Sequence, residues 1–136
     1  MSRKRILLVD DDADDQFIFK DAMNEIASDI ECIIANNGLE ALVNLKTSDP
    51  APSLIFLDLN MPLMNGFECL ERIKNDNQFK QIPVIIFTTS DSPADQKQTQ
   101  QLGAETFFTK TSDFKLLKAS LLNILKTDFS KLKIDL

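Results

Sequence analysis

The sequence predicts an α/β domain in which a parallel five-stranded sheet is covered by helices on both faces. Five short apolar runs recur along the chain, at residues 6–9, 32–35, 54–57, 84–87 and 106–108. Each run is continuous rather than alternating, as expected of strands buried on both sides. The segments between them have helical spacing. Because strand–helix–strand crossovers are right-handed, this alternation indicates a doubly wound sheet.

Apolar side chains at helical spacing predict the helices between the strands. The helix expected at residues 93–102 is the exception, because most of its residues are polar. The residues expected to face the core are Phe19, Ala22, Met23 and Ile26 in the first helix, Leu39, Leu42 and Leu45 in the second, Phe67, Leu70 and Ile73 in the third, and Leu117, Leu121, Ile124 and Leu125 in the last.

Start and stop signals support two of these helices. Asn37, with Glu40 three residues later, is typical of a capping box at the start of the second helix. Ser92 followed by Pro93 gives the fourth helix a cap and a proline at its first position. Gly103 follows the same helix, where a terminating glycine is expected.

The length of 136 residues suits one domain that needs no disulfide or structural metal. We expect this domain over residues 1–126 and a C-terminal tail over residues 127–136. The last six residues alternate polar and apolar, which is the pattern of a half-buried strand. Chain ends usually fray; the alternative is that the tail packs on this domain or on a second copy, forming a homodimer.

The net charge of −6 argues against general affinity for nucleic acid or for an anionic membrane. The apolar run at residues 6–9 is much shorter than a signal-peptide core or a membrane span of about 20 residues. Cys32 and Cys69 lie in apolar surroundings without metal-site spacing, so they are interpreted as buried thiols. We therefore expect a cytoplasmic protein.

Polar side chains follow four of the five strands. Because the carboxyl ends of parallel strands meet at one edge of the sheet, where α/β proteins bind ligands, we expect these side chains to lie close together. They are Asp10, Asp11 and Asp12 after the first strand, Asp58 after the third, Thr88 and Thr89 after the fourth, and Lys110 near the end of the fifth.

Acids at the ends of two strands repel each other unless a cation neutralises them. At about 4 Å and an effective dielectric near 20, each like pair costs roughly 4 kcal/mol. The chain has no histidine, which disfavours zinc and excludes a Ser–His–Asp triad. A hard cation with oxygen ligands fits better, and Mg²⁺ is the natural choice.

A carboxylate, Mg²⁺, a lysine and a hydroxyl are the parts that phosphoryl transfer to an aspartate requires. Each part also has an ordinary structural explanation. Asp58 or Asp11 alone could be a turn or cap acid, and Lys110 alone a surface charge. Asp14 and Asp15, with Asp12, are interpreted as a solvated acidic run at the start of the first helix. The joint placement at one sheet edge favours the functional interpretation.

These motifs together resemble the bacterial response-regulator receivers. The similarity rests on ILLVDDD at 6–12, LDLNMP at 57–62, Gly66, PVIIFT at 83–88, LGA at 102–104 and Lys110, and covers about residues 5 to 126. The resemblance implies a flavodoxin-like sheet with strand order 2-1-3-4-5. It also implies that Asp58 is the phosphoacceptor and that Mg²⁺ is bound by Asp11 directly, by Asp10 largely through water, by Asp58, and by the backbone carbonyl of Asn60.

By the same resemblance, Thr88 would hydrogen-bond the phosphoryl group and Lys110 would pair with it. Phe107 occupies the position of the switch aromatic, which changes rotamer with Thr88. Family members usually have a proline after the lysine, in a cis peptide, where this chain has Thr111. A non-proline cis bond costs about 3–4 kcal/mol, so the Lys110–Thr111 bond is either strained or trans.

The resemblance also implies the partners. A histidine kinase or a phosphotransfer protein would supply the phosphoryl group, in keeping with the missing histidine. Residues 127–136 are too few for an output domain, so the output would be contact with a downstream protein or onward transfer of the phosphoryl group.

Three other interpretations compete with a working receiver. A phosphatase of the haloacid-dehalogenase type needs an acid two residues after the nucleophile, where this chain has Asn60. A flavodoxin-like flavin module needs a hydroxyl- and glycine-rich first loop, where this chain is rich in aspartate. A receiver without phosphorylation would not need the full set of site residues.

Overall fold

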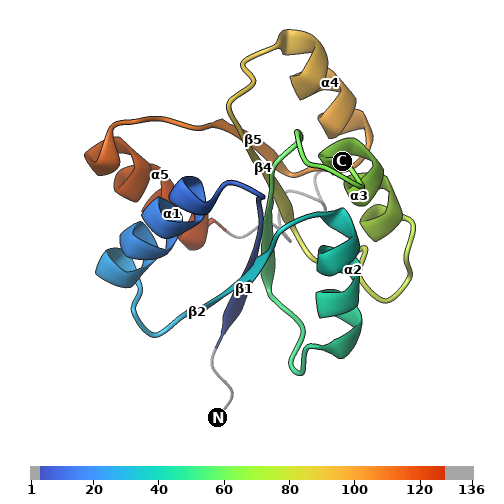
Figure 1. Ribbon diagram of the computed structural model, residues 1–136, viewed down its shortest axis with the longest axis horizontal. Helices are drawn as coiled ribbons and strands as arrows, with labels where there is room; N and C mark the ends of the chain where they lie inside the picture. Colours follow the sequence, from blue (N-terminus) through green and yellow to red (C-terminus); the bar gives the residue numbers. More distant parts are fainter. Residues whose placement is uncertain (1–3, 128–136) are drawn as a thin grey trace.

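The computed structural model describes residues 4–127, which form a parallel five-stranded sheet between two layers of helices (Figure 1). The strand order is β2-β1-β3-β4-β5, as predicted, and all neighbouring strands run parallel. The elements in chain order are β1 (Arg5–Val9), α1 (Ala13–Ile26), β2 (Glu31–Ala35), α2 (Gly38–Thr47), β3 (Leu54–Leu57), α3 (Gly66–Lys74), β4 (Val84–Thr88), α4 (Pro93–Gln101), β5 (Thr106–Thr109) and α5 (Phe114–Lys126).

Burial of the strands depends on their place in the sheet. The central strands β1, β3 and β4 are buried almost throughout, as their continuous apolar runs predict. The edge strands β2 and β5 are mostly half-buried. The expectation of burial on both faces was therefore wrong for these two, because an edge strand lacks a neighbour on one side.

Two apolar cores hold the layers together. Figure 1 shows α1 and α5 on one side of the sheet and α2 and α3 on the other. Phe19 of α1 packs on Phe56 and Phe87 of the sheet, with ring centroids 4.9 and 5.6 Å apart. On the opposite face, Leu45 of α2 and Leu70 of α3 are buried.

One apolar residue departs from the predicted helix faces. Leu45 is buried and Leu42 packs on the core, but Leu39 is 46% exposed. It lies in the first turn of α2 and points away from the helix face that Gly38, Ala41 and Leu45 bury.

The predicted helix signals are confirmed, except that the Glu40 side chain of the expected capping box accepts from the N–H of Asn36 rather than from that of Asn37. Asn37 caps α2 by accepting a hydrogen bond from the backbone N–H of Glu40 at 2.9 Å. Ser92 caps α4 in the same way, with the N–H of Asp95 at 3.3 Å. Gly103 has a φ of +107°, the left-handed region that favours glycine, and the N–H groups of Gly103 and Ala104 bond back to α4 as in a Schellman motif.

The two cysteines differ in burial. Cys69 is buried, as expected, whereas Cys32 lies on the edge strand β2 and is half-buried. Burial raises the pKa of the Cys69 thiol to about 12 and that of Cys32 to about 11. Both thiols are therefore poor nucleophiles at neutral pH.

No helix within residues 4–127 is long and apolar enough to cross a membrane. The tail expected over residues 127–136 lies outside the described residues except for Thr127, and so does the dimer contact that it suggested.

Candidate functional site

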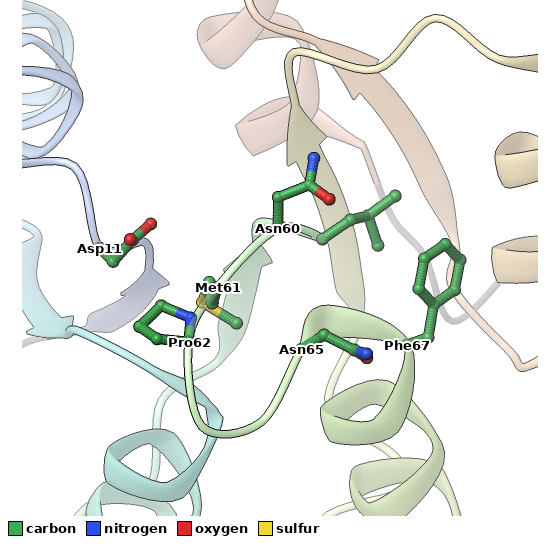
Figure 2. A pocket seen from close by; sticks show the side chains of 7 residues that line it. Asp11, Asn60, Met61, Pro62, Asn65 and Phe67 are labelled. Carbon is green, nitrogen blue, oxygen red and sulfur yellow. The ribbon is translucent and has the colours of Figure 1, made fainter.

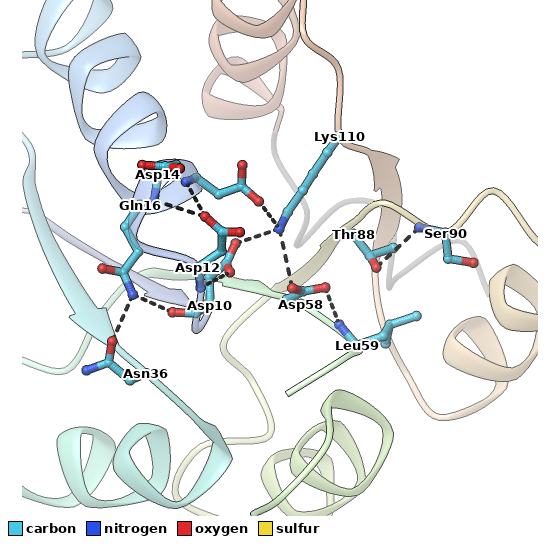
Figure 3. Close-up of polar contacts among 11 residues, drawn as sticks. Asp10, Asp12, Asp14, Gln16, Asn36, Asp58, Leu59, Thr88, Ser90 and Lys110 are labelled. Carbon is cyan, nitrogen blue, oxygen red and sulfur yellow. Dashed lines mark hydrogen bonds and ion pairs between the residues drawn. The ribbon is translucent and has the colours of Figure 1, made fainter. Parts of the chain in front are cut away.

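Three carboxylates meet at the carboxyl ends of adjacent strands. Asp10 and Asp11 follow β1, and Asp58 follows β3, which pairs with β1. The Asp58 N–H donates to the carbonyl of Val9 at 2.9 Å, so the ladder continues into the site. One oxygen of each carboxylate lies within 4.8 Å of the others. The predicted clustering of these three acids is therefore confirmed. Figure 3 shows two of them, Asp10 and Asp58.

The three acids differ in their exposure to water. Asp10 is completely buried and Asp58 is 7% exposed, whereas Asp11 is exposed. Burial raises the pKa of Asp10 above its usual value, although the close contact with the Lys110 ammonium opposes this effect. The Oδ2 atom of Asp10 has no well-aligned hydrogen-bond donor among the described residues. A buried, poorly satisfied carboxylate oxygen beside two other carboxylates suits a hard divalent cation, which this triad can hold.

The ammonium group of Lys110 neutralises part of this negative charge. Its Nζ lies 2.7 Å from Oδ2 of Asp10, 2.8 Å from Oδ2 of Asp15 and 3.3 Å from Oδ2 of Asp58. The contact with Asp10 is an ion pair without good hydrogen-bond alignment, which agrees with the poorly satisfied oxygen. Burial alone would lower the pKa of Lys110, but its bonds to Asp10 and Asp15 and the charge of Asp58 raise it overall. Lys110 is therefore charged at any physiological pH.

Backbone bonds place Lys110 at the site despite the missing proline. Its N–H donates to the carbonyl of Thr88 at 2.6 Å, which extends the pairing of β4 with β5. Asp49–Pro50 is the cis peptide within residues 4–127, so the Lys110–Thr111 bond is trans. The bond is therefore trans at the position where the receivers that this sequence resembles usually have a cis-proline.

The acidic run after β1 divides into two roles that the sequence did not separate. Asp12 caps α1, accepting bonds from the N–H groups of Asp14 and Asp15, and Asp14 is exposed. For these two the solvated interpretation is confirmed. It was wrong for Asp15, which is half-buried and bonded to Lys110. No sequence signal separates Asp14 from Asp15, since a cap at Asp12 puts both of them in the first helical turn.

Asp58 is held firmly by the backbone around it. Its Oδ1 accepts a hydrogen bond from the N–H of Leu59 at 2.8 Å, and its Oδ2 faces Lys110. The N–H of Gly66 donates to the carbonyl of Leu59 at 2.9 Å, which draws the start of α3 against this turn. A side chain at Gly66 would lie 2.2 Å from the carbonyl oxygen of Asp58. Gly66 therefore permits the close approach that shapes the site.

Asn60 and Asp11 line an open pocket of about 360 Å³ beside the acidic cluster. Figure 2 shows Met61, Pro62 and Phe67 completing its walls. Because this pocket is open and the exposed Asp11 lines it, a ligand can reach the carboxylates from this side.

Thr88 and Phe107 lie on the same side of the sheet. Thr88 is buried at the end of β4, and its hydroxyl accepts a long hydrogen bond of 3.4 Å from the N–H of Ser90. Phe107 pairs with Ile86 across β4 and β5, and Thr88 lies two residues beyond Ile86. The half-buried Phe107 also lines a cavity of about 180 Å³, between α4 and β5, with Thr99 and Ala104.

We expect a divalent cation such as Mg²⁺ to raise the melting temperature, and Asp11→Ala to remove this effect. A ligand that binds only the folded state at 20 times its Kd adds about 1.8 kcal/mol of stability. Asp11 is the exposed member of the triad, and its loss leaves two buried acids that are both in contact with Lys110. Circular dichroism melts with and without Mg²⁺ measure the shift. Asp14→Ala is the matched control and should keep it; an undiminished shift in Asp11→Ala would exclude this site.

Comparison with known proteins places the chain in a family. The sequence profile of the response regulator receiver domain matches residues 6–122. The response regulator Rcp1 of Synechocystis sp. is 35% identical over 117 residues, which is 82% of this chain and 80% of that protein. Chemotaxis protein CheY1 of Helicobacter pylori is 30% identical over 124 residues, or 91% of this chain and 98% of that protein.

Solved structures show the same similarity to response regulators. The phosphorylated cyanobacterial phytochrome response regulator RcpA superposes with a TM-score of 0.82 at 30% identity, covering 90% of this chain and 91% of its own. The Mn²⁺-bound form of response regulator Rcp1 gives a TM-score of 0.79 at 34% identity, covering 89% and 91%.

Proposed function

The chain belongs to the response regulator receiver family, whose members are phosphoacceptor switches rather than catalytic enzymes, and we propose that Asp58 is its phosphoacceptor. One observation carries this assignment. Asp58 and Asp10 both lie in the acidic triad and in contact with the Lys110 ammonium, but Asp10 is completely buried, whereas Asp58 is 7% exposed and so is the one of the two that a phosphodonor can reach.

The transfer itself forms one bond and breaks one. A carboxylate oxygen of Asp58 attacks phosphorus, the P–N bond of a phosphohistidine donor breaks, and its electron pair leaves with the imidazole, which then takes up a proton. The product is an aspartyl phosphate. Lys110, already within reach of Asp58, neutralises charge on the phosphoryl oxygens, and the Thr88 hydroxyl donates a hydrogen bond to one of them.

The residues also suit a particular cation. We propose Mg²⁺, bound by Asp11 and Asp58, by Asp10 largely through water, and by the backbone carbonyl of Asn60. Such an ion needs few carboxylates and keeps its other positions for water and phosphoryl oxygens. When bound, it would supply the positive charge that lets two anions, the donor and Asp58, approach each other.

The absence of histidine supports an external donor. Receivers pair with histidine kinases, and we propose that a histidine kinase or a phosphotransfer protein in the cytoplasm phosphorylates this chain. Its output would be a changed contact with a downstream protein. The acidic net charge of −6 supports a protein target rather than nucleic acid or a membrane surface.

We also propose how the chain is organised. A receiver domain would span residues 1–126, residues 127–136 would form a tail, and a homodimer would form through that tail.

We further propose that Thr88 and Phe107 form the switch. The hydroxyl of Thr88 has a long bond that is easily exchanged for one to a phosphoryl oxygen. Its movement would open space on the sheet face that it shares with Phe107, which already borders a cavity. The coupling would carry a local charge change to the surface of α4 and β5.

One experiment tests acceptor chemistry and switching together. Acetyl phosphate and Mg²⁺ should add a single phosphoryl group by intact-mass spectrometry, and hydroxylamine should remove it. In the same sample, NMR should show altered Thr88 methyl and Phe107 ring signals. Without Mg²⁺ the adduct should be nearly absent. A protein that takes up no phosphoryl group under these conditions would contradict the function; unchanged Thr88 and Phe107 signals in a phosphorylated sample would contradict the switch.

A further inference from the structure

One ammonium group forms ion pairs with three carboxylates at this site. Lys110 has three N–H donors but a single positive charge. It contacts Asp10 and Asp58, which are labelled in Figure 3, and also Asp15. Those to Asp10 and Asp15 are short, at 2.7 and 2.8 Å, while that to Asp58 is 3.3 Å. The ammonium therefore lies nearer to Asp15 than to Asp58.

Lys110 and a metal ion need the same oxygens. Asp10 and Asp58 belong to the triad that can hold a divalent cation, and both are in contact with Lys110. Two positive groups cannot both approach these carboxylates closely without repulsion. The side chain of Lys110 is only 10% exposed, so its ammonium group cannot simply move into water when a cation binds.

Asp15 is the partner of Lys110 that lies outside the triad. We infer that Asp15 is a positioning residue that retains Lys110 when a divalent cation takes Asp10 and Asp58, and thereby favours cation binding. This inference rests on the proposed function of the site. Asp15 acts on the metal and on the phosphoryl group only through Lys110.

The setting of Asp15 suits this role. It lies in the first turn of α1, where the helix dipole stabilises a carboxylate. Its backbone N–H is bonded to the cap Asp12, which fixes the turn relative to the end of β1. Its side chain is 34% exposed, so water compensates its charge whenever Lys110 turns to Asp58 or to a phosphoryl group. A fully buried acid would not release the lysine so readily.

A double-mutant cycle on Mg²⁺ affinity tests the inference. The proteins are the wild type, Asp15→Asn, Lys110→Met and the double variant, each titrated with Mg²⁺ and followed by ¹H–¹⁵N NMR of the intact chain. Without Asp15, Lys110 must stay on the metal ligands, so Asp15→Asn should raise the Kd for Mg²⁺ about 5-fold. Lys110→Met should lower it, because a competitor is removed.

The cycle separates positioning from a simple charge effect. If Asp15 acts through Lys110, Asp15→Asn should change the Kd less than about 2-fold in the Lys110→Met background. A through-space loss of negative charge would persist there, and that result would overturn the inference. Asp14→Asn, which removes the same charge from the exposed neighbour, is the matched control and should also stay within about 2-fold. Asp15→Glu keeps the carboxylate and should have the same Kd for Mg²⁺ as the wild type. If Lys110→Met does not fold, Lys110→Ala takes its place in the cycle.

Failure of the inference is distinguishable from failure of the proposed function. If the wild type does not bind Mg²⁺, or if the wild type and Asp11→Ala bind it with the same Kd, the metal site itself would be contradicted. A wild type that binds Mg²⁺ and loses it in Asp11→Ala, with no change in Asp15→Asn, would overturn the role of Asp15 alone.

Discussion

Asp58→Asn is expected to abolish phosphoryl incorporation from acetyl phosphate in the presence of Mg²⁺. The amide that replaces the carboxylate has no nucleophilic anion, and it also withdraws a ligand from the acidic triad. The fold should be retained, because asparagine has the same shape and its Oδ1 can still accept the bond from Leu59. Intact-mass spectrometry should show the adduct in the wild type and only the unmodified mass in the variant.

The control for this prediction is Asp14→Asn, which removes a charge from the exposed part of the same acidic run and should leave the adduct unchanged. Thermal melts without metal separate lost chemistry from lost structure. Asp58→Asn removes one of several clustered negative charges, so its melting temperature should equal or exceed that of the wild type. An equal adduct on the variant would assign the acceptor to another residue.

Gly66→Ala is expected to lower the free energy of unfolding by about 3 kcal/mol. The added Cβ would lie 2.2 Å from the carbonyl oxygen of Asp58 and 2.6 Å from Cα of Leu59. Both are backbone atoms of the turn after a buried strand, so relief requires α3 to move away from the sheet. That movement would also break the bond from Gly66 N–H to Leu59 and shift Asp58. Urea unfolding measures the loss, and the phosphorylation assay should show a lower rate.

Gly38→Ala is a matched comparison, because Gly38 and Gly66 both begin a helix directly after an asparagine cap. At Gly38 the nearest atoms to an added Cβ belong to the side chain of Met64, at 2.9 to 3.0 Å. A methionine side chain, even one buried in the core, adjusts more easily than a backbone turn, so the cost should stay below about 2 kcal/mol and below that at Gly66. Equal losses in the two variants would show that the backbone contact at Gly66 is not what makes the substitution costly.

Strand ends were the most predictable part of this protein, and the reason is topological. Once alternating strands and helices imply a parallel sheet, every residue that directly follows a strand must lie at one edge. Asp10, Asp11 and Asp58 were therefore brought together by the fold class alone. The same reasoning placed Lys110 beside them.

The helix ends were equally predictable from the sequence, because capping depends on neighbours within a few residues. Asn37, Ser92 and Gly103 act as the local sequence predicts. Exposure was less predictable. Leu39 and Cys32 fit apolar patterns, but Leu39 points away from the buried face of α2 and Cys32 lies on an edge strand. A pattern carries no information about how far the neighbouring layer covers such positions.

By itself, then, the sequence determined the sheet, its helices and the group of residues that the strands deliver to one edge, since these follow from hydrophobic periodicity and strand direction. Only the tertiary structure decided which acid Lys110 binds and how closely α3 approaches Asp58. Asp15 and Asp14 are adjacent and chemically identical, and a difference in side-chain direction makes one a partner of Lys110 and leaves the other in water. Contacts between residues 95 positions apart depend on how helices seat on the sheet, and that is settled by packing across the whole domain.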